Sequence, residues 1–164
     1  MKGNVRLFST CPKSSDHTHE TYFDQVVQVA GWSEEAGCTG ILVYTDNGPV
    51  DGWLTAQLII QKTMRLCPLV AVQPAYMHPY STAKLVASLA FLHSRRVHLN
   101  MVAGGVANDL ASLNDTTAHD RRYDRLFEYT TIIQNLLSTP RGVSYKGEFY
   151  SLNNGRMTPA LPAE

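Results

Sequence analysis

Two residues that could bind a ligand, His119 and Tyr123, stand four positions apart at the start of a predicted helix. Side chains at i and i+4 lie on the same face of a helix, and the amino end of a helix favours anions. With Arg121 or Arg122 nearby, the imidazole and the phenol could hold a phosphate group. A solvated first helical turn would explain the same spacing, so both interpretations stay open.

Three further polar residues, Asp46, Gln73 and Asn100, stand at or near the ends of predicted strands. Asp46 could cap a turn, accept a hydrogen bond from a ligand, or do both. Asn100 lies in an otherwise apolar strand, so we expect its amide to be buried and hydrogen-bonded. That amide could bridge neighbouring strands or present a donor and an acceptor to a flat heteroaromatic ligand.

Metal binding and nucleophilic catalysis are the competing chemistries. His17 and His19 form an HxH pair after the first strand, a pattern that occurs in metal-dependent hydrolases. The pair lies several residues beyond the strand end, and His98 is equally well explained as a core residue, so we expect no metal. Cys11 is the candidate nucleophile, although a lone cysteine without a clear base is more often a small buried residue.

Composition excludes several classes of partner. Apolar residues make up 44% and charged residues 17% of the 164 positions, which is typical of a globular protein. Fourteen basic side chains balance fourteen acidic ones, so net charge gives no reason to bind nucleic acid or anionic membrane. We expect neither a signal peptide nor a membrane span. Three widely spaced cysteines without a CxxC pair favour a reducing compartment, the cytoplasm.

Periodicity predicts strands that alternate with helices. Thr21 is the expected N-cap of the first helix and Gly37 its stop. The tail VSYKGEFYSL is predicted to form a small hairpin or an extended segment. We predict strands over 4–10, 40–46, 66–74 and 96–105, and helices over 22–36, 51–63, 80–94 and from near Asp120 to before Pro140.

Alternating strands and helices predict an α/β fold with a parallel sheet. The sheet could be open and doubly wound, or it could be part of a (β/α)8 barrel. The sequence contains no GxGxxG motif and no P-loop, which lowers the odds of a nucleotide-binding Rossmann domain. In both closures ligands bind at the carboxyl ends of the strands, where Cys11, Asp46, Gln73 and Asn100 would gather.

Four stretches together resemble the bacterial-luciferase-like flavin monooxygenases, closest to the alkanesulfonate and nitrilotriacetate monooxygenase branch. They are GILVYTDNGPVDGW, RLCPLVAVQPAYMHPYSTAKLVASLAFL, RRVHLNMVAGG and HDRRYDRLFEY. The resemblance implies a TIM-type barrel that binds reduced FMN, supplied by a separate NAD(P)H:flavin reductase. The reduced flavin reacts with O2 to oxygenate a small organic substrate.

The resemblance also implies roles for individual residues. The family residue that ends strand two lies against the flavin, which points to Asp46. The positions that match Gln73 and Asn100 flank the isoalloxazine. The His-x-x-x-Tyr pattern after strand four contacts the FMN phosphate, which points to His119 and Tyr123.

Two positions depart from the alkanesulfonate enzymes. Their cysteine in the loop after strand two is matched by Pro49, and their histidine after strand one is matched by Cys11. Sulfonate specificity is therefore not implied, and oxidation of an aldehyde, a ketone or a secondary metabolite is equally open.

A complete barrel of this type needs about 250 residues, and the chain stops before a fifth strand. We therefore expect one luciferase-like domain over residues 1–164 that holds the first four β/α units, a half-barrel. A half-barrel exposes two sheet edges and an apolar face, so we expect a homo-oligomer. The competing function is a catalytically inactive flavin-binding or interaction fragment of the same fold.

Overall fold

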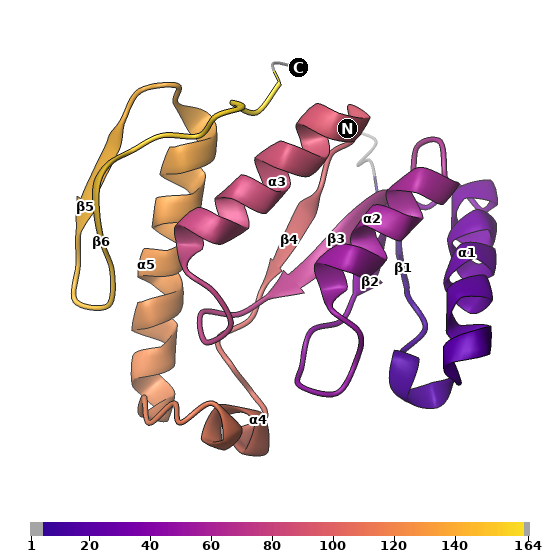
Figure 1. Cartoon of the computed structure of the whole chain (residues 1–164), viewed down its shortest axis with the longest axis horizontal. Coiled ribbons are helices and arrows are strands. Elements are labelled where there is room, and N and C mark those ends of the chain that lie inside the picture. Colours follow the sequence, from indigo (N-terminus) through magenta and orange to yellow (C-terminus); the bar gives the residue numbers. More distant parts are fainter. Residues whose placement is uncertain (1–4, 163–164) are drawn as a thin grey trace. The chain divides into compact units, whose positions relative to one another are not determined.

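The structure is a computed structural model, and it describes residues 5–162. Strands and helices alternate along the chain up to β4, and a hairpin follows the last helix (Figure 1). In chain order the elements are β1 (Phe8–Thr10), a 3-10 turn (Ser14–Asp16), α1 (His19–Glu35), β2 (Gly40–Val43), α2 (Gly52–Lys62), β3 (Cys67–Val72), α3 (Pro79–His93), β4 (His98–Met101), α4 (Ala107–Ser112), α5 (His119–Ser138), β5 (Val143–Lys146) and β6 (Ser151–Gly155).

Within residues 5–162, β1, β2, β3 and β4 form one sheet in that order, and β5 pairs with β6. The pairs β1–β2 and β2–β3 are parallel, with Phe8 opposite Gly40 and Gly40 opposite Cys67. A doubly wound sheet reverses its strand order at a switch point, whereas a (β/α)8 barrel keeps strands in chain order. The observed order therefore confirms the barrel-type prediction, with the first four β/α units present.

The chain divides into two compact units, which are described separately. Unit 1 comprises the described residues up to Ala71 together with Arg95–Asn100, and unit 2 comprises Val72–Ser94 and the described residues from Met101 onward. The single domain over residues 1–164 stays a prediction.

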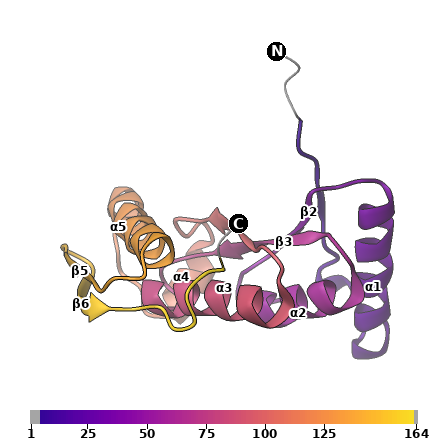
Figure 2. The ribbon, with the colours of Figure 1, turned by 90° about the horizontal axis from the view of Figure 1, so that it is seen from above.

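The core of unit 1 lies between α1, α2 and the strands. Figure 2 shows α2 covering one face of the strands of this unit. Apolar side chains from all these elements are fully or almost fully buried there, namely Val26, Ala30, Ile41, Val43, Ile59 and Leu66. Asp51 begins α2 by accepting the N–H of Trp53 at 2.9 Å, as an N-cap residue does.

A ring contact in unit 1 depends on Gly40. The rings of Phe8 and His98 meet edge to face, with centroids 5.6 Å apart. A Cβ at Gly40 would lie 2.8 Å from the Phe8 ring and 2.3 Å from the carbonyl oxygen of Cys67. The close approach of β3 and of the Phe8 ring therefore requires a residue without a side chain at position 40.

Unit 2 is built on the packing of α3 against α5 (Figure 1). The hydroxyl groups of Thr82 and Tyr129 form a buried hydrogen bond between these helices. Isoleucine and leucine side chains of α5 are also buried, namely Ile132, Ile133 and Leu136.

The β5–β6 hairpin is fastened to α5 by one carboxylate. Glu128 accepts the backbone N–H groups of Glu148, Phe149 and Tyr150 at 2.8, 3.0 and 3.1 Å. The predicted hairpin in the tail is thus confirmed, and its tip is held to the helix that precedes it.

Several predicted boundaries are wrong by a few residues. α1 begins at His19 with Thr18 as N-cap, and Thr21, the predicted cap, instead accepts the backbone N–H of Thr18 at 3.2 Å. The predicted stop at Gly37 is confirmed, with a φ of 78°. The strands are shorter than predicted, α4 was not predicted, and residue 4 of the first predicted strand lies outside the described residues.

Candidate functional site

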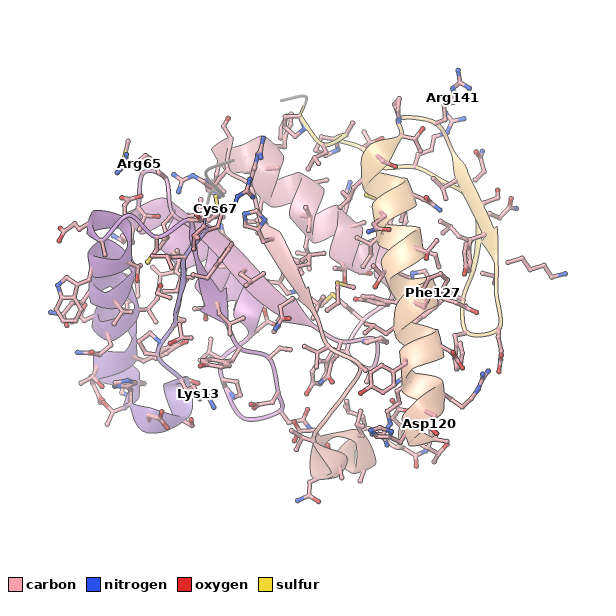
Figure 3. The ribbon with its side chains drawn as sticks, turned by 180° about the vertical axis from the view of Figure 1, so that it is seen from behind. Lys13, Arg65, Cys67, Asp120, Phe127 and Arg141 are labelled. Carbon is pink, nitrogen blue, oxygen red and sulfur yellow. The ribbon has the colours of Figure 1, made fainter. Side chains whose placement is uncertain are left out.

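A pocket of about 320 Å³ opens beside the first two turns of α5 in unit 2. Main chain of the segment that follows β4 forms one wall, and side chains of α5 form the other. The lining residues are Met101, Val102, Ala103, Gly104, Gly105, His119, Arg122, Tyr123 and Leu126. Figure 3 shows Asp120 at the beginning of α5 and Phe127 further along the same helix.

His119 and Tyr123 line this pocket together. Their ring centroids are 5.7 Å apart at an interplanar angle of 68°, which confirms that they share a helix face. The imidazole is 72% exposed, and its Nδ1 lies 3.0 Å from Oδ1 of Asp120. Tyr123 is 58% exposed. Both polar ring tips are therefore accessible to a ligand.

The two arginines that lie between His119 and Tyr123 in the sequence have different surroundings in the structure. Arg121 points away from the pocket, forms ion pairs with Asp124 and Glu148, and lies over the ring of Phe149. Arg122 lines the pocket, and its Nε donates to the carbonyl oxygen of Thr117 at 3.0 Å. Arg122 is therefore the cation of this site.

Arg122 also joins α5 to the opposite wall. Its Nη1 donates to the carbonyl oxygen of Gly104 at 3.3 Å. Gly104 has a φ of 101°, a conformation that suits glycine. A Cβ there would lie 3.4 Å from Oε1 of Gln73. Gln73 is 5% exposed, so it supports the pocket wall from behind rather than lining the pocket.

A buried ion pair braces the segment that leads into α5. Arg125 Nη2 donates to Oδ2 of Asp115 at 2.6 Å, and the two side chains are 12% and 10% exposed. Asp115 also accepts the N–H of Thr117 at 3.0 Å. Burial alone would raise the pKa of Asp115, but these donors lower it to about 2. The pair therefore stays ionised at neutral pH.

The other candidates, Cys11, Asp46 and Asn100, belong to unit 1. Cys11 is 4% exposed, and burial raises the pKa of its thiol to about 12. It is therefore a core residue rather than a nucleophile. Asp46 accepts the N–H of Gly48 at 2.7 Å, which is the turn-capping role. The expectation that Asn100 is buried is wrong, because its side chain is exposed whereas the other three residues of β4 are partly buried.

Sequence reasoning anticipated the main chain at the end of the fourth strand, but it missed Leu126 and did not choose between Arg121 and Arg122. The signal for both side chains was helical spacing from His119, since i+3 and i+7 fall at Arg122 and Leu126. Among the described residues, no three His, Cys, Asp or Glu side chains form a group that could hold a metal ion. None of the helices described is long and apolar enough to cross a membrane.

Comparison with known proteins identifies the family of this chain. The model of the luciferase-like monooxygenase family matches residues 4–164. The monooxygenase BtrO of Niallia circulans is 36% identical to this chain over 141 residues. Its full name is 4-(gamma-L-glutamylamino)butanoyl-[BtrI acyl-carrier protein] monooxygenase. That match covers 86% of this chain and 41% of BtrO, so the chain spans less than half the length of this relative.

Solved structures show the same fold at low sequence identity. EDTA monooxygenase EmoA of Chelativorans sp. BNC1 superposes with a TM-score of 0.81 at 16% identity, over 96% of this chain and 48% of EmoA. The oxygenating constituent of 3,6-diketocamphane monooxygenase from Pseudomonas putida, in complex with FMN, superposes with a TM-score of 0.70 at 14% identity. That second match covers 90% of this chain and 43% of the other. This chain belongs to the luciferase-like monooxygenase family.

Proposed function

We propose that this chain forms the flavin-binding part of a monooxygenase that uses reduced FMN and O2 to oxygenate a small organic substrate. The observation that carries the proposal is the pocket at the start of α5, where His119, Arg122 and Tyr123 converge. Membership of the luciferase-like monooxygenase family supports the reaction class.

The donor set of this pocket fits a phosphate group. An imidazole, a guanidinium and a phenol supply hydrogen bonds and positive charge, as phosphate recognition requires. α5 is 20 residues long, and its amino end adds a partial positive charge. A Cβ at Gly105 would meet nothing within 4 Å, so the main chain there is open to a ligand. His119, Arg122 and Tyr123 would hold the phosphate of FMN.

A bound reduced flavin supplies the electrons for oxygen chemistry. In our proposal the residues of this chain bind and orient it. Arg122 fixes the Gly104 main chain relative to α5. Gln73 supports that wall, and Asp46 and Asn100 are proposed to lie toward the ring system.

The remaining components of the reaction are also proposed. A separate NAD(P)H:flavin reductase supplies the reduced FMN in the cytoplasm, and copies of the chain associate into a homo-oligomer. Sulfonates are not the proposed substrates, because Pro49 and Cys11 replace the residues expected of enzymes acting on them. The alternative is flavin binding without turnover, and the two are separated by the oxygen-uptake measurement below.

Replacing Arg122 with glutamine is expected to weaken binding of reduced FMN about tenfold, because one charge-assisted hydrogen bond to phosphate is lost. Binding of reduced riboflavin, which lacks the phosphate, should stay within about twofold. The double variant His119→Ala/Tyr123→Phe should show the same selectivity. An anaerobic titration followed by flavin fluorescence measures both ligands.

Arg121→Gln is the matched control, because it removes the same charge from a neighbouring side chain that points away from the pocket. It should leave the affinity for reduced FMN within about twofold of the wild type. Equal losses for FMN and riboflavin, or equal effects of Arg121→Gln and Arg122→Gln, would contradict the phosphate assignment. Oxygen uptake with bound reduced FMN then separates a monooxygenase from a protein that only binds flavin.

A further inference from the structure

A second pocket, of about 450 Å³, lies in unit 1 at the amino ends of β2, β3 and β4. Its volume falls within the range of small-molecule sites. The lining residues are Arg6, Glu34, Gly37, Cys38, Thr39, Arg65, Cys67, Arg96 and His98. Figure 3 shows Arg65 and Cys67 together at one end of this unit, and Lys13 at the opposite end. The pocket is therefore separate from the strand ends where Cys11 and Asp46 lie.

Positive charge dominates this pocket. Three guanidinium groups, those of Arg6, Arg65 and Arg96, line it with a single carboxylate, Glu34, among the described lining residues. That carboxylate is already engaged, because it accepts the N–H groups of Met64 at 3.0 Å and Leu66 at 2.8 Å. Burial alone would raise the pKa of Glu34, but the backbone donors of residues 64–66 and the charge of Arg65 hold it below its ordinary value. Glu34 therefore anchors the turn before β3 and interacts with the charge of Arg65.

The charge of these arginines affects the pKa of His98. Burial lowers its pKa, and the guanidinium groups of Arg6 and Arg96 lower it further. His98 also contacts the Phe8 ring, which fixes its orientation. The pocket thus combines three cations with a neutral, half-buried imidazole that can report on their neutralisation.

We propose that this pocket binds the dianionic phosphate group of free phosphate or of a small phosphate monoester. Guanidinium groups match phosphate oxygens in geometry and charge, and three of them line this one pocket. The site is distinct from the proposed FMN site, because its residues belong to the other unit.

The cysteines of the pocket serve as reporters rather than as reactive groups. Cys67 is half-buried, and its Sγ lies 3.5 Å from the carbonyl oxygen of Arg65. Burial raises the pKa of the Cys67 thiol although Arg95 and Arg96 oppose that effect. A phosphate held by Arg65 and Arg96 would cover Cys67 and slow its alkylation by a neutral maleimide. Cys11 is buried, so it should stay unlabelled in the native chain.

The test titrates the full chain with inorganic phosphate, glycerol 3-phosphate or glycerol, at constant ionic strength set with chloride. Proton NMR of the His98 ring reports binding and the pKa of His98, which should rise when phosphate neutralises Arg6 and Arg96. Maleimide labelling followed by mass spectrometry should show at least threefold slower modification of Cys67. Tighter binding of glycerol 3-phosphate than of phosphate would identify an ester site, and equal binding a free-phosphate site.

Arg6→Gln/Arg96→Gln should weaken phosphate binding at least tenfold, whereas Arg6→Lys/Arg96→Lys should retain most of it. Arg141→Gln is the control, because Arg141 is an exposed arginine of unit 2, before β5 (Figure 3). It should change the affinity by less than twofold. An equal response of His98 to chloride alone, or an equal loss in Arg141→Gln, would overturn the proposal.

Discussion

Replacing Gly40 with alanine is expected to lower the free energy of unfolding by about 3 kcal/mol. The added methyl group would lie 2.3 Å from the carbonyl oxygen of Cys67 and 2.8 Å from the Phe8 ring. The first contact is with main chain of the neighbouring strand, which cannot rotate away as a side chain can. Either β2 and β3 separate, or the Phe8 ring leaves His98. Urea unfolding followed by circular dichroism measures the loss.

Gly31→Ala is the matched control for this substitution. Gly31 lies within α1, and a Cβ there would meet nothing within 4 Å. Alanine favours helix over glycine by about 1 kcal/mol, so this variant should be slightly more stable than the wild type. If Gly31→Ala lost stability, or if Gly40→Ala lost none, the close contacts at position 40 would not be the reason that glycine is required there.

Replacing Asp115 with alanine is expected to cost about 3 kcal/mol, because it leaves the buried guanidinium of Arg125 without its partner. Asp124→Asn removes a carboxylate from an exposed ion pair with Arg121, whose side chains are 45% and 56% exposed. That control should change the free energy of unfolding by less than about 0.5 kcal/mol. Similar losses in the two variants would mean that the buried pair contributes no more than the exposed one.

The same pair predicts a dependence on pH. The pKa of Asp115 is about 2 in the folded protein against an ordinary value of 3.8. A carboxylate with a lowered pKa stabilises the fold above its ordinary pKa, and that contribution disappears as pH falls through the folded value. This contribution to the free energy of unfolding is about 2 kcal/mol. The wild type should therefore lose this stability between about pH 4 and pH 2, whereas Asp115→Ala should lack this component.

Local sequence signals predicted the elements but not their boundaries. Gly37 was identified as the end of α1 because glycine readily adopts the positive φ found there. Thr18 and Thr21 are equally good N-caps by residue type, and only the structure shows that Thr21 bonds back to Thr18. α4 was missed because its six residues are too few for a helical period to stand out.

The candidate site was predictable where its residues share one helix. His119 and Tyr123 follow from i, i+4 spacing. The choice of Arg122 over Arg121 could not be predicted from this spacing. Arg121 is held by an ion pair with Glu148, a hairpin residue 27 positions later in the sequence. The predicted burial of Asn100 was wrong for a related reason, because an apolar strand sequence does not reveal which of its side chains other elements cover.

Glu128 and His119 belong to one helix but to different surfaces of it, and this division matters for protein engineering. Glu128 holds the hairpin main chain, whereas His119, Arg122 and Tyr123 line the pocket. Residues without shared partners usually contribute additively. Libraries that vary the pocket residues can therefore be screened for new ligands without redesign of the hairpin, and stabilising changes in the hairpin can be added afterwards.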